Sequence, residues 1–191
     1  DDANDTQPCC SDTEYPAYYV DTLAITTFLE SSTYNEFLNV LLVDALPPTS
    51  DSVIILFDPD EDLVGDTSFQ SRFGTGEVTQ DLYSFTVSPP PVDWDYSQDA
   101  NRNFTTVDSG LLLELSFGVT ALLYNAAITG QFSADYSAIT HGAISGGIRE
   151  VDTVSVETSF GNLHDLMDGR TLDADTDGNG TPDGWTFVME F

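Results

Sequence analysis

Residues 121–156 read ALLYNAAITGQFSADYSAITHGAISGGIREVDTVSV, and this stretch decides whether the chain folds mainly as helices or as strands. Ile, Thr, Ser and Gly dominate it, and Gly destabilises a helix, so paired strands fit better. Two similar segments, AAITGQFS and AITHGAISGG, occur here with the segment SADYS (133–137) between them. The stretch therefore predicts a β-hairpin that turns at 133–137, because two copies are too few for a repeat array.

Further strands are expected on both sides of this hairpin. Segments rich in β-branched and aromatic residues, or with alternating apolar residues, are typical of strands. The last such segment runs to the final residue, so we expect the C-terminus to be fixed in a sheet. The segments are 17–30, 52–58, 77–88, 103–133 (at least two strands) and 185–191.

Two short helices are expected between the strands. Residues 33–46, TYNEFLNVLLVDAL, begin with a capping box of Thr33 and Glu36 and end before two prolines. Residues 159–169, SFGNLHDLMDG, form the second helical segment. We therefore predict a mainly β fold, a single β-sandwich or barrel-like domain over 17–191 with one or two short inserted helices. Residues 1–16 lack a periodic apolar pattern and are expected to form an extended arm.

The charge balance limits the partners of this chain. The 191 residues carry 33 acidic side chains, mostly Asp, against 4 Arg and no Lys, which gives a formal net charge of −29. Such a charge repels nucleic acid and anionic membrane surfaces. No apolar run is long enough to span a bilayer. The self-repulsion must be relieved by salt or by bound cations, and the excess of Asp favours calcium.

The N-terminal segment favours a secreted protein. The chain begins at Asp without an initiator Met, which we interpret as a processed N-terminus, although a trimmed chain would look the same. Cys9 and Cys10 are adjacent, and a bond between neighbours is strained, so free thiols, a strained vicinal bond and bonds to other chains all stay open. Asn4, Asn103 and Asn179 begin Asn-x-Ser/Thr triplets, which permit glycosylation in a secreted protein.

Residues 175–185, DTDGNGTPDGW, follow the order of ligands in an EF-type calcium loop. Such a loop places oxygen ligands at positions 1, 3 and 5, Gly at 6, a backbone carbonyl at 7 and a further ligand at 9. Counted from Asp175, these positions hold Asp177, Asn179, Gly180, Thr181 and Asp183. An acidic surface turn that binds no ion is the alternative.

This frame resembles the calcium repeat of thrombospondin type 3 modules and the EF-hand-like loops of many secreted bacterial proteins. The resemblance covers residues 175–185 only and implies Ca²⁺ as the ion. The chain departs from the EF-hand at position 12, where Thr186 stands in place of a bidentate Glu, so Asp173 or Glu190 would have to complete the site. We predict a calcium loop at 173–184 with the ligands Asp173, Asp175, Asp177, Asn179, Thr181 and Asp183.

Two further acidic clusters are either second calcium sites or solvated loops. They are DPDED, with Asp58, Asp60 and Asp62, and DWDYSQD, with Asp93, Asp95 and Asp99. Neither follows the full order of a calcium loop.

The sequence shows no familiar catalytic motif. His141 and His164 lie in different segments without the paired spacing of a zinc site. A carboxylate pair for glycoside hydrolysis stays open as an alternative, because distance and not spacing defines it. Tyr15, Tyr18, Tyr19, Trp94 and Tyr96 either form a sugar-stacking face or fill the core or a subunit interface.

We therefore expect a structural protein and not an enzyme. The leading interpretation is a secreted, calcium-stabilised protein at the cell surface or outside the cell, which assembles with copies of itself into a fibre or surface layer. The arm would add a strand to a neighbour's sheet. The alternative is a calcium-stabilised β-sandwich module that binds a carbohydrate (glycan) or a lipid.

Overall fold

The computed structural model shows a mainly β chain, as predicted. Within the residues that the structure describes, eleven strands form one sheet with antiparallel pairing, and two further short strands pair with each other. The structure describes residues 17–19, 24–27, 52–57, 63–64, 66–79, 82–85, 92–107, 111–116, 120–158, 161–167 and 169–191.

The strands of the large sheet are not arranged in chain order. Their spatial order is β1-β3-β4-β6-β7-β9-β10-β13-β2, with β5 paired to β4 and β8 paired to β9. The first strands are β1 (Ala17–Tyr19), β2 (Ala24–Thr27), β3 (Ser52–Phe57), β4 (Ser68–Thr79) and β5 (Leu82–Phe85). The next are β6 (Val92–Gln98), β7 (Asn103–Thr106), β8 (Leu111–Ser116), β9 (Thr120–Phe132) and β10 (Ile139–Arg149). The chain ends with α2 (Glu150–Thr153), β11 (Glu157–Thr158), β12 (Gly161–Asn162), α3 (Leu163–Met167) and β13 (Gly184–Glu190).

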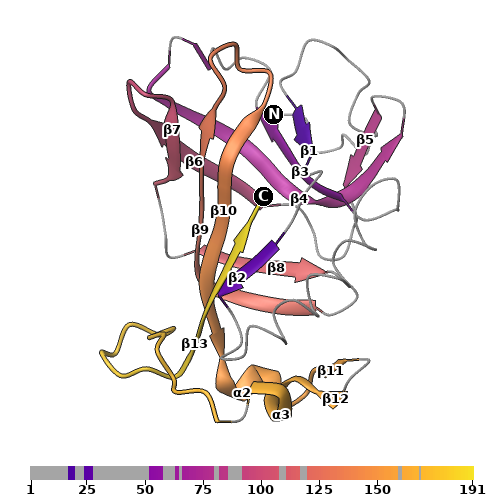
Figure 1. Cartoon of the computed structure of the whole chain (residues 1–191), viewed down its shortest axis with the longest axis vertical. Helices are drawn as coiled ribbons and strands as arrows, with labels where there is room; N and C mark the ends of the chain where they lie inside the picture. The colour runs from indigo at the N-terminus through magenta and orange to yellow at the C-terminus, as the bar shows by residue number, and fades with distance from the viewer. Residues whose placement is uncertain are drawn as a thin grey trace, which may run out of the picture.

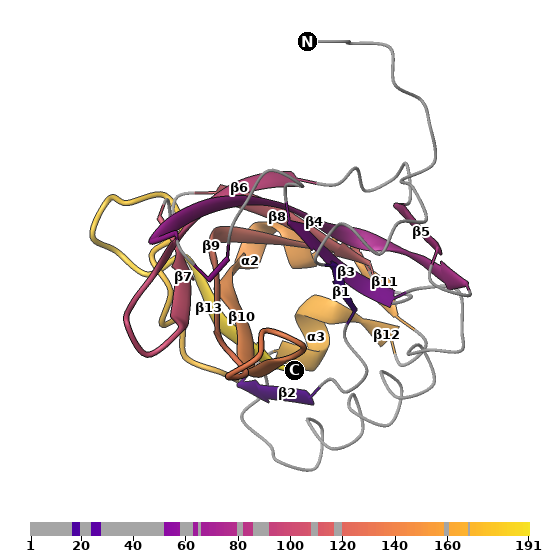
Figure 2. The ribbon, with the colours of Figure 1, turned by 90° about the horizontal axis from the view of Figure 1, so that it is seen from above.

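The large sheet curls strongly. Figure 1 shows β9 and β10 running along most of the molecule, with α2, α3, β11 and β12 gathered at one end of them. From above, the strands follow a curved path around a central axis (Figure 2). Of the two predicted architectures the barrel-like one is therefore closer, although the strand path of the described residues ends at β1 and β2 without pairing them.

The predicted hairpin at 133–137 is confirmed. β9 and β10 pair as antiparallel neighbours, from Ile139 opposite Phe132 to Gly147 opposite Tyr124. In the turn the Asp135 carboxylate accepts hydrogen bonds from the hydroxyls of Ser133 and Ser137, at 2.7 Å each. A side chain that bonds its own turn in this way explains why an acidic residue occupies the tip.

Bulges bend both strands of this hairpin. The register shifts on β10 between Thr140 and Ala143, and on β9 between Leu123 and Ala126 where it pairs with β8. His141 and Asn125, which lie at these shifts, have the positive φ angles of 54° and 52°. Because a bulge increases the local twist, these two positions help the long strands to curl.

Aromatic side chains make up much of the buried core. Phe69 stacks on Tyr96 and Phe73 on Trp94, with ring centroids 5.5 and 5.7 Å apart. Every second residue of β13 joins the same core, because alternate side chains of a strand point to one face. The buried β13 residues are Trp185, Phe187 and Met189.

The C-terminus is fixed in the sheet, as expected. β13 lies between β10 and β2. Phe191, which follows the last residue of β13, exchanges two backbone hydrogen bonds with Gly142 on β10, of 2.9 and 3.0 Å.

Three predictions for the elements need correction. Residues 17–30 form not one strand but two, β1 and β2, which pair with different partners at the two ends of the sheet. Residues 77–88 contain the end of β4 and all of β5, which form a hairpin with only residues 80–81 between them. The short helix α2 occupies residues that were expected to continue in strands. The helix expected at 159–169 is present, but as α3 it covers five residues only.

Several predictions lie outside the described residues. They concern the arm at 1–16 with Asn4, Cys9 and Cys10, the helix at 33–46, and the acidic cluster of Asp58, Asp60 and Asp62.

Candidate functional site

The predicted calcium loop lies between α3 and β13 and is closed at its base by the backbone. Asp183 N and Gly184 N donate to Ala174 O, at 2.9 and 3.1 Å, and Ala174 N donates to Gly184 O at 3.0 Å. Gly184 is also the first residue of β13, so the loop leads straight into a strand of the large sheet. In Figure 1 the loop extends to one side of the sheet, near the end that carries α2 and α3.

The first ligand position organises the loop. The carboxylate of Asp175 accepts backbone hydrogen bonds from Gly178, Asn179 and Gly180, at 2.9, 3.2 and 2.7 Å. Gly178 and Gly180 have φ angles of 74° and 86°, a conformation that residues with a Cβ adopt at a cost. The Gly at position 6 of the predicted frame thus makes the sharp turn that such a loop requires.

Positions 3 and 5 lie beside each other in the same loop. Asp177 accepts hydrogen bonds from the backbone and side-chain nitrogens of Asn179, at 3.1 and 2.9 Å. Asn179 Oδ1 in turn accepts from Thr181 N at 2.8 Å. The structure therefore brings Asp175, Asp177, Asn179 and Thr181 together, and their oxygen atoms are of the type that calcium prefers.

Asp183, the predicted ninth position, faces the sheet. Its carboxylate accepts hydrogen bonds from the backbone N and the hydroxyl of Thr176, both at 2.7 Å, and lies 3.3 Å from Arg149 Nε. The backbone hydrogen bond from Thr176 is the main reason why the pKa of Asp183 lies below its ordinary value, and Arg149 adds to it. We call Asp183, Thr176 and Arg149 the loop clamp.

The loop clamp fixes the loop to β9 and β10. Arg149 ends β10, donates to the Thr176 hydroxyl at 2.9 Å and places its guanidinium 4.1 Å from the ring centre of Tyr124 on β9. Asn125, the bulge residue of β9, donates to Asp175 O at 3.2 Å. Packing between a cation and an aromatic face adds to the attraction of the ion pair.

The two residues predicted to complete the site are placed differently. Asp173 accepts from Thr186 N at 2.7 Å and from Arg170 at 3.2 Å. Partial burial raises the pKa of Asp173, but the bonds from Thr186 and Arg170 outweigh it and the pKa lies below its ordinary value. Glu190 is the last residue of β13, at the opposite end of the strand from the loop.

The cluster of Asp93, Asp95 and Asp99 is divided among separate partners. Asp93 forms an ion pair with Arg72 at 2.8 Å, and Asp95 accepts from Gln70 at 2.6 Å. Asp99 accepts from Asn101 and Asn103. In the described part of the chain, no three His, Cys, Asp or Glu side chains lie close enough together to form a metal-binding group. This second site stays a prediction from the sequence.

Two of the five aromatic residues considered for a sugar-stacking face belong to the core. Trp94 and Tyr96 are 2% and 0% exposed, so of the two alternatives the structure supports the core for both. Tyr18 is half-buried and donates its hydroxyl to Tyr136 O. Burial, and the nearby Asp135, raise the pKa of Tyr18 to about 12.

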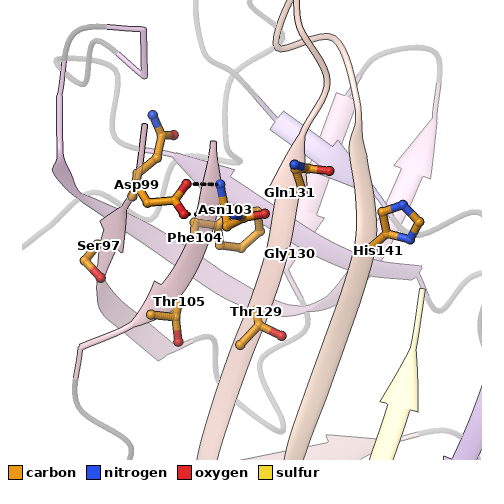
Figure 3. Close-up of a pocket in the computed structure, with 10 residues that line it drawn as sticks. Ser97, Asp99, Asn103, Phe104, Thr105, Thr129, Gly130, Gln131 and His141 are labelled. Carbon is orange, nitrogen blue, oxygen red and sulfur yellow. Dashed lines mark hydrogen bonds between the residues drawn. The ribbon is translucent and has the colours of Figure 1, made fainter. Parts of the chain in front are cut away.

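A groove that the sequence did not predict lies at the hairpin end of β9 and β10. It has a volume of about 530 Å³ and is lined by residues of β6, β7, β9 and β10 and of the turn between β6 and β7. Figure 3 shows its polar side chains, among them Ser97, Asn103, Thr129, Gln131 and His141. We call this feature the outer groove, because Asn103 and Thr129 lie on the solvent-facing side of the sheet.

No protein-family model matches the chain, and neither a curated protein nor a solved structure matches it. None of the helices in the described residues has the length and apolar character needed to cross a membrane.

Proposed function

We propose that this protein is an extracellular structural domain whose sheet is stabilised by calcium bound at the loop 175–183. The observation that carries the proposal is the gathering of Asp175, Asp177 and Asn179 in EF-type order around a tight glycine turn. Calcium takes carboxylate, amide and backbone carbonyl oxygens, and the side chains of these residues supply the first two classes. Thr181 would add its carbonyl.

The fit of calcium to this loop is partial in two respects. Both carboxylate oxygens of Asp183 are hydrogen-bonded to Thr176, and Arg149 lies close by, so this side chain supports the loop from the sheet side. With Thr186 at position 12, the loop also lacks the bidentate Glu of an EF-hand. We therefore expect an affinity in the range of extracellular calcium modules, with a dissociation constant on the order of 10⁻⁴–10⁻³ M. Such a site is useful only where calcium is abundant, which favours a location outside the cell.

We further propose that calcium allows copies of this chain to assemble with each other. The chain has a net charge of −29, and the four arginines all bond within their own chain. Arginines engaged in this way offer little positive charge to a second copy. Neighbouring copies would therefore repel one another unless divalent cations lowered the charge. This supports an assembly that depends on calcium.

Calcium titration with particle sizing tests both parts of the proposal. In a calorimetric titration, the wild-type protein should show a heat of calcium binding that saturates as one site. Its particle size should increase as the calcium concentration rises. The Asp177→Asn variant should show no heat of calcium binding. The control is Asp66→Asn, which changes an exposed acidic residue outside the loop and should behave as wild type. Absence of a calcium heat in the wild type would refute the loop site. A monomer that binds calcium would refute assembly alone.

A further inference from the structure

The outer groove is lined by groups that form hydrogen bonds with neutral molecules. Its walls carry the hydroxyls of Ser97, Thr105 and Thr129 and the amides of Asn103 and Gln131 (Figure 3). A hydroxyl or an amide both donates and accepts hydrogen bonds, which is the property that a ligand rich in hydroxyl groups requires.

Part of this capacity is not used within the described residues. There the hydroxyls of Ser97 and Thr129 have no hydrogen-bond partner, whereas Gln131 Nε2 is fixed by Asn101 O at 3.1 Å. Thr129 is exposed and Ser97 is half-buried. The groove therefore combines a positioned amide with two hydroxyls that are available to a ligand.

The charges around the groove favour a neutral ligand. Its lining contains neither Lys nor Arg, and the molecule carries a net charge of −29, so an anion is repelled. Asp99 is the one carboxylate among the described residues of the lining. It already accepts hydrogen bonds from Asn101 N and from both nitrogens of Asn103, at 2.8–2.9 Å.

The floor of the groove is formed by paired backbone. Phe104 on β7 lies opposite Gly130 on β9, and a Cβ at Gly130 would approach the Phe104 ring to 2.5 Å. Both positions therefore point into the core, where Phe104 is only 2% exposed. On the groove side, their neighbours form the polar lining: Asn103, Thr105, Thr129 and Gln131.

The far wall is formed by a residue in an unfavourable backbone conformation. His141 has a φ angle of 54° at the bulge of β10, and its side chain is exposed at the edge of the groove (Figure 3). A left-handed conformation is unfavourable for a residue with a Cβ, and such conformations are often retained at functional sites.

From the neutral hydroxyl and amide walls and the volume, we propose that the outer groove binds a neutral saccharide of one or two pyranose rings. Such a ring has hydroxyl groups at its edge for Thr129, Ser97 and Gln131. The site lies at the hairpin end of β9 and β10, whereas Arg149 and the loop clamp lie at the other end. Saccharide binding does not depend on the proposed calcium site.

Nuclear magnetic resonance titration with four neutral disaccharides tests this proposal: cellobiose, maltose, lactose and diacetylchitobiose. The protein should be produced in bacteria, so that Asn103 carries no glycan and the groove is open. We expect saturable shifts with at least one disaccharide, largest at residues 97–105 and 129–141. Digalacturonate, which is anionic, should not bind.

Two substitutions test whether the saccharide binds in the outer groove. Thr129→Trp should fill it and lower the affinity by about tenfold or more, and Thr129→Val should lower it by removing one hydroxyl. Both should keep the fold, because Thr129 is exposed on a strand, where these residue types are favoured. Thr171→Trp, at an exposed position away from the groove, is the matched control. The proposal is overturned if no neutral disaccharide saturates, if the shifts lie elsewhere, or if a folded Thr129→Trp binds as tightly as wild type.

Discussion

At the scale of single residues, the acidic side chains of the loop have two different roles. Asp175 and Asp177 hold the loop in shape and offer oxygen atoms to an ion, whereas Asp183 bonds the loop to the sheet through Thr176 and Arg149. A ligand pattern in the sequence cannot separate these roles. Substitution with and without calcium can do so.

Asp183→Asn should destabilise the protein even when calcium is removed. The substitution removes the charge that faces Arg149 and weakens both bonds to Thr176, so we expect a loss of about 1–2 kcal/mol in the free energy of unfolding. Asp177→Asn changes an exposed side chain and should cost less than about 0.5 kcal/mol under the same conditions. Urea unfolding in excess chelator measures both values.

The same pair should behave differently when calcium is added. Asp177→Asn should lose the stability that calcium gives to the wild type, because it removes a proposed ligand. Asp183→Asn should keep at least part of that gain. Equal losses for the two variants in chelator, or a full calcium gain in Asp177→Asn, would show that the two roles are wrongly assigned.

The turn residue Asp135 should titrate at unusually low pH. Hydrogen bonds from the hydroxyls of Ser133 and Ser137 lower its pKa from 3.8 to about 2. The pKa is lower in the folded state than in the unfolded state, so its contribution to stability is present above about pH 4 and is lost as the pH falls toward about 2. The carboxyl carbon shift of Asp135, followed by nuclear magnetic resonance, should have its midpoint near 2. A midpoint at 3.8 would mean that the turn bonds are absent in solution.

At the scale of elements, the strands with clear alternation were predictable and the interruptions were not. Trp185, Phe187 and Met189 alternate in the sequence and are buried together on β13. The hairpin of β4 and β5 was missed because residues 80–81 are Gln-Asp, which lacks the glycine that favours two-residue turns. The bulge at His141 was also missed, since its positive φ is set by the pairing of neighbouring strands and not by the residue itself.

Gly184 is the element boundary most sensitive to substitution. It closes the loop and begins β13, and a Cβ there would lie 2.4 Å from the carbonyl oxygen of Ile148 and 2.9 Å from the methyl of Thr176. Gly184→Ala should therefore destabilise the protein by about 1–3 kcal/mol, because the backbone of β10 must move. Urea unfolding measures the loss, with Thr171→Ala at an exposed position as the control. A variant as stable as wild type would mean that the loop base is looser than the structure shows.

At the scale of the whole molecule, both sites combine segments that are distant in the sequence. The calcium frame could be recognised because its proposed ligands lie within one short segment, from Asp175 to Thr181. The contacts of Asp183 could not be predicted without the fold. Asp183 pairs with Arg149 on β10, and Arg149 in turn packs on the ring of Tyr124 on β9. The outer groove was not predictable either, because residues 97–105 and 129–141 meet only when β7 pairs with β9.

The net charge of the molecule opposes a compact fold, and cations would reduce this opposition. With a net charge of −29 and its arginines engaged internally, the protein folds against its own repulsion. A cation bound at the base of β13 would act on the strand that joins β10 to β2. We therefore expect calcium to stabilise the whole sheet and not only the loop.

Thermal unfolding in excess calcium and in excess chelator, with particle size recorded in both, tests this account most directly. An ion that binds only the folded state adds about 2.7 kcal/mol at a hundredfold excess over its dissociation constant. We predict a clearly higher unfolding midpoint in calcium, together with large particles that fall to monomers in chelator. An unchanged midpoint and an unchanged size would contradict the calcium-stabilised, self-assembling domain proposed here.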